Sequence, residues 1–290
     1  MFGWKKANFS NYLEAYNLYG GGLSTSPEIL TFLHQRYDLN EKYYIRHNKE
    51  RITAAICVWN DQFLAGDPDA YHKIGIEHPL YTDEIMFPFH KDEKSFIFLK
   101  SKYISQLHQN NIINTAHAIN AHREICLVKT VSSKTKSSRN RELNRFLKNE
   151  GSIVNINDIS ISDFVDLYDE LYFMRRNEHQ NKQLLADILN EIPSLKFGNI
   201  LLYKNSPAAV QFVIKKQTID KIYFNFVNTG RRMDIDDIPI GTIAMWVNVR
   251  DAISLCEEKN LEMRFSFGRP TFEYKMRWCD THKLYRTISL

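Results

Sequence analysis

The chain has 290 residues, of which 43% are hydrophobic and 25% charged, the composition of a folded globular protein rather than of a disordered or fibrous one. No apolar run is long enough to span a membrane and no secretory segment is visible, so we expect a cytoplasmic protein. The formal net charge of +4 permits an anionic partner and selects none. The four cysteines form no C-x-x-C pair and the histidines show no ligand spacing, so we expect neither a disulfide framework nor a metal site.

Two helices are expected near the start of the chain. The first covers residues 8–19 and ends at the glycines 20–22, and the second begins at Ser26-Pro27. Four strands are expected from runs of β-branched and aromatic residues: 42–47, 52–59, 84–89 and 124–130. The first two strands form a hairpin through residues 48–50. Residues 63–79 contain the turn Gly66-Asp67-Pro68 and are expected to be loop-rich.

A basic segment at residues 129–148 marks the clearest change in composition, because Glu142 is its only acid. Its serine-rich part, 132–138, has no periodic apolar residues and predicts a linker or mobile loop. Leu143, Phe146 and Leu147 have helical spacing, so 140–149 predicts a short amphipathic helix. We therefore expect two lobes, 1–130 and 131–290.

The second lobe predicts an α/β fold. Helices are expected at 161–176 and 181–191, then strands at 199–203, 208–215 and 221–227, a helix at 242–259 and a strand at 263–267. A meander of strands that ends in a β-α-β crossover makes a mixed sheet with helices packed on its faces.

The loop 234–242, between a strand and a helix, is the first candidate site. Gly241 lets the backbone come close to a ligand, and the N–H groups at the helix start, around Thr242, can bind a phosphate. Three acids, Asp234, Asp236 and Asp237, would repel a phosphate if they pointed inward. A simple turn or cap is the alternative interpretation.

The segment 264–279 is the second candidate site. It gathers cations, an acid and aromatic side chains at the end of a sheet strand, where ligands of α/β proteins often bind. Gly268 turns the chain, and a short helix is expected from Thr271 onward. The alternative is a basic surface helix whose Tyr274 and Trp278 pack inward.

Two motifs in this region resemble the FemAB/CelD-like branch of the GNAT acyltransferase superfamily. They are Phe265-Ser266-Phe267-Gly268-Arg269 and Tyr274-Lys275-Met276-Arg277-Trp278. The step Pro239-Ile240-Gly241 resembles the same pattern but departs from it by one inserted residue. Residues 19–21, 26–27 and 56–59 resemble a narrower family, the macrophage-inducible proteins of enteric bacteria linked to antimicrobial-peptide resistance and virulence.

The resemblance implies a GNAT-like fold of two lobes, with the N-terminal lobe degenerate and the C-terminal lobe complete. It implies an acyltransferase that takes its acyl group from acyl-CoA or aminoacyl-tRNA and transfers it to an amine or hydroxyl of a bacterial envelope component. Acyl-CoA is then a co-substrate, and no permanently bound cofactor is expected. Members of the branch often lack the usual pyrophosphate loop, which leaves catalysis itself open.

The same resemblance suggests roles for individual residues. The candidates for the general base are Asp236, Asp237 and Glu273. The candidates for protonating the leaving thiolate are Tyr223 and Tyr274. The candidates for binding the donor are Pro239, Gly241, Thr242, Gly268, Arg269 and Lys275.

Two other functions remain open from the basic segment 134–148. It could contact the phosphates of a nucleic acid as part of a transcriptional regulator, although the sequence has no helix-turn-helix, zinc-finger or RNP pattern. It could also hold a non-catalytic protein on the anionic surface of the inner membrane.

Overall fold

The computed structural model describes residues 3–78, 80, 82–120 and 123–288. The chain forms two compact units, each discontinuous in sequence. Unit 1 is drawn from Met1–Leu127, Gln217–Tyr223 and Phe267–Leu290, and unit 2 from Val128–Lys216 and Phe224–Ser266. These units describe packing. The predicted pair of GNAT-like lobes, 1–130 and 131–290, stays a prediction.

Unit 1 combines three helices with short strands. Its elements are β1 (Lys5–Ala7), α1 (Phe9–Tyr19), α2 (Pro27–Arg36), β2 (Lys42–Asn48), β3 (Arg51–Trp59), β4 (Phe63–Leu64), α3 (Pro68–Ile74), β5 (Ile104–Ser105), η1 (Gln106–His108), β6 (Thr115–Ala116), β7 (Glu124–Val128), η4 (Glu273–Arg277) and β14 (Cys279–Thr287). The strands β1 to β4 form one sheet in that order. Strand β14 pairs with β5 and β6 and is a neighbour of β7, so the end of the chain packs within this unit.

The first two helices of unit 1 begin where the sequence predicts, and α1 also ends there. The Asn8 side chain accepts from the backbone N–H of Asn11, and Gly20 ends α1 with a φ of 69°, a conformation that favours glycine. Ser26 caps α2 and Pro27 occupies its first turn. The hairpin of β2 and β3 is antiparallel, as expected.

Two predictions for unit 1 are wrong. Residues 84–89 form only isolated bridges instead of a strand, because Pro88 lacks the N–H that a regular ladder requires. Residues 63–79 contain the short helix α3, where a loop was expected. Asp67 accepts from the N–H of Asp69 at its start, and Gly75 ends it in the left-handed conformation.

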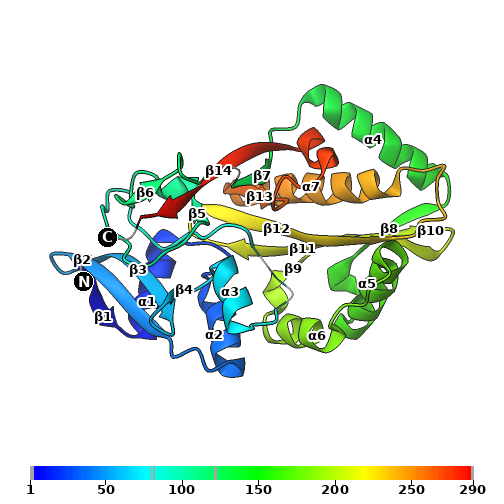
Figure 1. Cartoon of the computed structure of the whole chain (residues 1–290). Helices are drawn as coiled ribbons and strands as arrows, with labels where there is room; N and C mark the ends of the chain where they lie inside the picture. Colours follow the sequence, from blue (N-terminus) through cyan, green and yellow to red (C-terminus); the bar gives the residue numbers. More distant parts are fainter. Residues whose placement is uncertain (1–2, 79, 81, 121–122, 289–290) are drawn as a thin grey trace. The chain divides into compact units, whose positions relative to one another are not determined.

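Unit 2 is a sheet covered by helices. Its elements are α4 (Ser133–Lys148), β8 (Gly151–Asn155), η2 (Ile156–Asp158), α5 (Ile161–Arg176), α6 (Lys182–Glu191), η3 (Pro193–Leu195), β9 (Lys196–Phe197), β10 (Asn199–Tyr203), β11 (Ser206–Gln217), β12 (Lys221–Arg231), α7 (Ile240–Lys259) and β13 (Glu262–Ser266). The last residue of β11 and the first three residues of β12 count with unit 1. Within this unit the strands follow the order β8-β10-β11-β12-β13. Figure 1 shows α4 and α7 on one face of this sheet and α5 and α6 on the other.

The topology of unit 2 confirms the predicted α/β class with a mixed sheet. Strands β8, β10 and β11 pair antiparallel, whereas β12 and its neighbour β13 are joined through the helix α7. Aromatic side chains fill the core: Phe164 and Tyr168 of α5 both lie 5.4 Å from Phe212 of β11, measured between ring centroids. On the other face Trp246 of α7 is buried and donates to Asn140 of α4 over 2.9 Å.

The serine-rich part of the basic segment is helical, so the predicted linker at 132–138 is wrong. Ser132 caps α4 by accepting from the N–H of Thr135, and the helix then continues into the predicted amphipathic part. Its first turns were missed because a helix whose exposed side chains are all polar shows no apolar period. Strands β8 and β14 were not predicted, and α7 begins at Ile240 rather than at Thr242.

Over the residues that the structure describes, no helix has both the length and the apolar character needed to cross a membrane.

Candidate functional site

The start of α7 in unit 2 leaves one backbone N–H without a hydrogen-bond partner among the described residues. No side chain caps this helix, and its first turn contains no acid. The N–H groups of Ile240, Thr242 and Ile243 are bonded to the carbonyls of Ile238 and Pro239. The N–H of Gly241 has no hydrogen-bond partner within the described ranges. A free N–H at the positive end of a long helix dipole is suited to an anion.

Gly241 is half-buried but has room for a side-chain Cβ. A Cβ added there would be 3.6 Å from Cδ and 4.0 Å from Nε of Arg231, which are ordinary contacts. Packing therefore does not require glycine at this position. Its absent side chain instead leaves the backbone accessible beside a guanidinium, and Arg231 has no ion pair with any residue that the structure describes. One cation and one free N–H thus lie together at the helix start.

The three acids of the preceding loop differ in their environment. Asp234 forms a 2.5 Å ion pair with Arg232, which holds the pKa of this carboxyl below its usual value. Asp236 and Asp237 are exposed. The repulsion expected from Asp234 is therefore reduced by its own partner, and two carboxylates remain accessible as proton acceptors.

The Gly268-Arg269 turn of unit 1 is fixed by an acid distant in sequence. Arg269 Nε donates to Oδ1 of Asp83 over 2.7 Å, and its guanidinium lies 5.8 Å from the centroid of the Tyr103 ring. Gly268 has a φ of 68°, and a Cβ there would lie 2.9 Å from Oδ2 of Asp83. Burial lowers the pKa of Arg269, but the ion pair with Asp83 outweighs it and the net shift is upward. Glycine is therefore needed at position 268.

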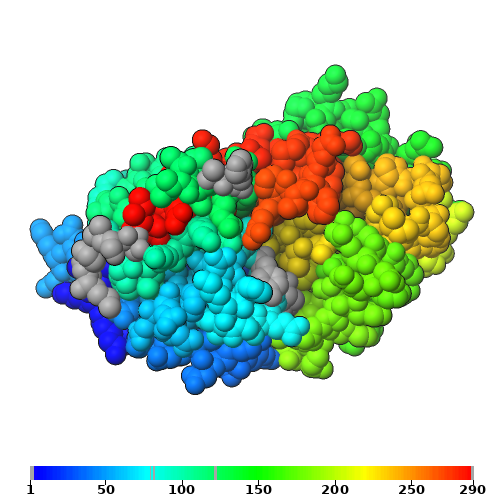
Figure 2. Space-filling view, in the orientation of Figure 1, coloured from blue at the N-terminus to red at the C-terminus, as the bar shows by residue number. Residues whose placement is uncertain are grey.

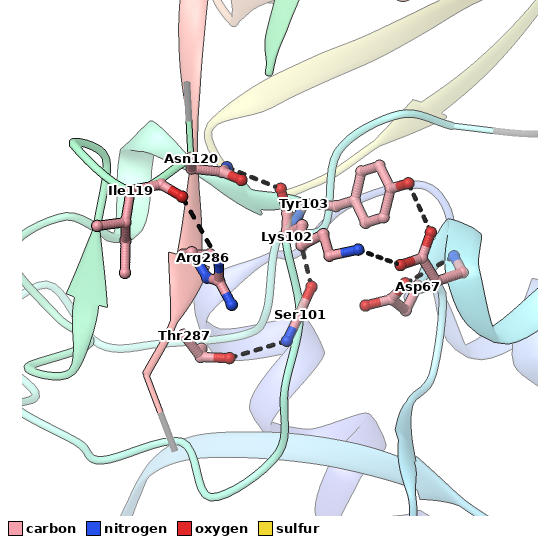
Figure 3. Close-up of polar contacts among 9 residues, drawn as sticks. Asp67, Ser101, Lys102, Tyr103, Ile119, Asn120, Arg286 and Thr287 are labelled. Atoms are coloured by element: carbon pink, nitrogen blue, oxygen red, sulfur yellow. Dashed lines mark hydrogen bonds and ion pairs between the residues drawn. The ribbon is translucent and has the colours of Figure 1, made fainter. Parts of the chain in front are cut away.

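A polar network surrounds Tyr103 in the same unit (Figure 3). Its hydroxyl donates to Asp69 over 2.7 Å, and Lys102 forms a 3.4 Å ion pair with the same carboxylate. Ser101 N–H donates to the Thr287 hydroxyl, and Asn120 donates to the carbonyl of Lys102. These contacts fix the segment 101–103 against β14, and Tyr103 in turn supports Arg269.

Lys275 is a buried lysine with a backbone partner. Its side chain donates to the carbonyl of Arg269 over 2.6 Å, and the residue is 7% exposed. Burial lowers the pKa of its ammonium, and the neighbouring Cys126, Asp83 and Cys279 oppose that shift only partly. The Lys275 amine therefore links the η4 segment to the Gly268-Arg269 turn, and both belong to the FemAB-like motifs.

We predict that Lys275→Met changes the free energy of unfolding at pH 7 by less than about 1.5 kcal/mol, as volume-conserving core substitutions do. The variant loses a hydrogen bond but no longer buries an ammonium, and the two effects offset each other. Urea unfolding measures the change. A loss of about 3 kcal/mol or more would instead assign Lys275 a structural role in closing the turn.

The predicted site residues are divided between the units. Asp236, Asp237, Pro239, Gly241 and Thr242 belong to unit 2, and Tyr223, Gly268, Arg269, Glu273, Tyr274 and Lys275 belong to unit 1. Glu273 is exposed, Tyr223 is buried, and the Tyr274 ring stacks on Phe272 at 6.0 Å between centroids. Their catalytic and binding roles stay predictions.

Two residues were missed by the sequence reasoning, Arg231 beside Gly241 and Asp83 beside Arg269. Arg231 carried a weak signal, because it stands close before the predicted phosphate loop. Asp83 carried none, since 186 positions separate it from Arg269. Within the ranges that the structure describes, no three His, Cys, Asp or Glu side chains are arranged to hold a metal ion.

Solved structures show the fold of the chain. FemX matches with a TM-score of 0.53 and 7% identity over 98% of this chain and 97% of its own. A conserved protein of unknown function from Bacteroides thetaiotaomicron matches with a TM-score of 0.51 and 10% identity, over 99% and 98%. A tandem GNAT protein from the clavulanic acid biosynthesis pathway matches with a TM-score of 0.46 and 8% identity, over 99% and 98%. The chain has the fold of FemX, in agreement with the FemAB-like fold that the motifs at 265–278 predicted.

The particular family follows from the sequence. The family model for Mig-14 matches residues 26–287, and the chain belongs to the Mig-14 family. No curated protein matches the chain in sequence. The family assignment confirms the narrower resemblance found in residues 19–59.

Proposed function

We propose that the protein is an acyltransferase that modifies an amine or hydroxyl group of a bacterial envelope component and thereby contributes to antimicrobial-peptide resistance and virulence. The observation that carries this proposal is the start of α7, where Gly241 presents a free N–H beside Arg231. The reaction class is supported by the resemblance of the motifs at 265–278 to FemAB-like acyltransferases and by the fold shared with FemX. Acyl-CoA is the donor we favour, and aminoacyl-tRNA is the alternative.

The donor's phosphates would bind at this helix start. The N–H of Gly241 and the Arg231 guanidinium both donate to phosphate oxygens, and guanidinium–phosphate pairs are among the stronger hydrogen bonds in proteins. Pro239, the N-cap residue of α7, and Thr242 flank Gly241 at this helix start. In unit 1, Arg269 and Lys275 are the candidates for binding an anionic part of donor or acceptor, on the Gly268 turn.

Transfer itself needs a nucleophile, a base and a proton for the leaving group. The acceptor's amine or hydroxyl attacks the thioester carbonyl, a carboxylate removes its proton, and the CoA sulfur leaves as a thiol after it is protonated. Asp236 and Asp237 of unit 2 and Glu273 of unit 1 are the candidates for the base. Tyr223 and Tyr274 are the candidates for the acid.

We predict that CoA raises the midpoint of thermal unfolding of the natural protein and that Gly241→Asp abolishes the shift. A ligand at 100 times its Kd adds about 2.7 kcal/mol of stability. An aspartate at 241 would place a carboxylate beside the donated N–H and repel the phosphates. The measurement is a thermal melt with and without CoA and acetyl-CoA.

Gly241→Ala is the matched control for this experiment. Its Cβ makes only ordinary contacts with Arg231, so the variant folds and adds no charge. It should retain most of the CoA-induced shift. A natural protein that shows no shift with CoA or acetyl-CoA would count against a CoA donor. A shift that survives Gly241→Asp would place the donor elsewhere.

We further propose that the protein lies peripherally on the anionic face of the inner membrane, with α4 as the contact. The residues of α4 that support this are exposed and basic. Basic residues near an anionic bilayer each contribute on the order of 1 kcal/mol to binding.

A further inference from the structure

One face of α4 carries four cations and no acid. Lys134, Arg141, Arg145 and Lys148 are 7, 4 and 3 positions apart, which places them within about 60° of one another around a helix of 3.6 residues per turn. We call these four residues the basic stripe. All four are exposed, whereas Leu143 and Phe146 of the opposite face are buried. Figure 2 shows this helix, in green, at the surface of unit 2.

The stripe is not neutralised by the protein. The only acid of the helix, Glu142, is bound by Arg139 at 2.6 Å, and that pair lies off the stripe. None of the four stripe cations forms an ion pair with a residue in the described part of the chain. A row of like charges on one helix face is destabilising, so a counter-ion on this face would relieve that repulsion.

The stripe also borders a pocket. Arg141, Arg145 and Lys148 line a shallow pocket of about 490 Å³ together with the amide side chains of Asn144 and Asn149. All five lining residues are hydrogen-bond donors and none is acidic. The two arginines stand one helical turn apart, so both planar donor groups can reach one anion.

The negative, C-terminal end of the α4 helix dipole does not outweigh the positive charges of the pocket. Asn149 N–H is bonded to the carbonyls of Arg145 and Phe146, which satisfies part of the negative helix end. The dipole amounts to about half an elementary charge, against three full positive charges at the pocket.

We propose that this pocket binds a phosphate ester through the Arg141 and Arg145 guanidinium groups, the Lys148 ammonium and the amides of Asn144 and Asn149. The chemistry is shared by a lipid headgroup and by a free phosphate ester. Arginine forks match the tetrahedral oxygens of phosphate better than isolated ammonium groups do. The site deepens the membrane proposal, since it names the group that α4 would recognise, and it does not depend on acyl transfer.

The first test is titration of inorganic pyrophosphate into the full chain that carries Gly241→Asp, so that the proposed donor site cannot contribute. We expect saturable binding that weakens about tenfold in a further Arg141→Ala/Arg145→Ala variant. Lys136→Ala/Lys259→Ala is the matched control, because it removes two exposed cations of unit 2 that lie off the stripe. It should bind as tightly as its parent. Absence of binding at low salt, or equal loss in both variants, overturns the site.

The second test separates the two sources of phosphate. Vesicles of phosphatidylcholine with and without phosphatidic acid are sedimented with the same variants. Recruitment by phosphatidic acid that needs Arg141 and Arg145 and is reversed by pyrophosphate assigns a lipid headgroup. Pyrophosphate binding without recruitment assigns a soluble phosphate ester. Recruitment unaffected by both the variant and pyrophosphate shows a diffuse surface effect and overturns the pocket.

Discussion

Gly230→Ala is expected to destabilise the protein by about 3 kcal/mol, the upper end of the range for overpacked sites. Gly230 lies in β12 directly beneath α5. A Cβ there would be 2.7 Å from the Cβ of Leu171 and 2.8 Å from the backbone N of Tyr172. Because these atoms belong to the helix itself, no side-chain rotation relieves the clash. The helix or the strand must move.

The measurement is urea unfolding of the natural protein and the variant. Gly241→Ala is the matched control, since the same methyl group makes only ordinary contacts with Arg231 there. It should be neutral or stabilising by up to about 1 kcal/mol. Equal effects of the two substitutions would show that α5 adjusts freely and that close packing on Gly230 is not required.

The close approach at Gly230 also matters for the candidate donor site. Arg175 of α5 donates to the carbonyl of Thr229 over 2.7 Å. Arg231 follows Thr229 by two positions along β12. The helix therefore holds the end of β12, the strand that positions Arg231 beside Gly241. A shift of α5 would displace the cation that the donor site needs.

The sequence predicted elements whose signals are local. Helices α1 and α2 have side-chain caps and stop signals within a few residues, and α5 has a continuous apolar stripe. The first half of α4 lacks that stripe, because its stability comes from Ser132 at its start and from the packing of its second half. Strand β14 is rich in polar residues and is specified by pairing with β5 and β6, elements more than 160 residues away.

The candidate site shows the same limit. The motifs pointed to Gly241 and to Gly268-Arg269, because glycine turns and their neighbours leave a recognisable pattern. They could not show that Arg269 has Asp83 as its partner, since only folding brings these residues together. They also could not show that Gly241 is sterically dispensable whereas Gly268 is not. That difference comes from three-dimensional surroundings and separates a glycine open to a ligand from one required by a turn.

Asp67→Asn is expected to stabilise the protein at neutral pH by up to about 3 kcal/mol and to have no effect below pH 4. Asp67 is 3% exposed, and burial raises its pKa from 3.8 to about 6, although bonds from Ser101 and the Asp69 N–H oppose the shift. A raised pKa means that the folded state favours the protonated acid. The folded state is therefore penalised progressively as pH rises from about 4 to 6, at 1.36 kcal/mol per unit of pKa difference.

Asparagine removes that penalty while it preserves the cap, because its oxygen can still accept from the N–H of Asp69 and asparagine caps helices as well as aspartate does.

Asp69→Asn provides a control of opposite sign. Although burial alone would raise the pKa of Asp69, the Tyr103 hydroxyl and Lys102 lower it overall, so its charge stabilises the fold at neutral pH and that contribution disappears as pH falls. Urea unfolding at pH 4, 5.5 and 7.5 (values chosen to bracket the predicted window) distinguishes the two. If Asp67→Asn changes the free energy of unfolding equally at all three pH values, the Asp67 carboxyl is solvated in the folded protein. The start of α3 is then more open than its hydrogen bonds indicate.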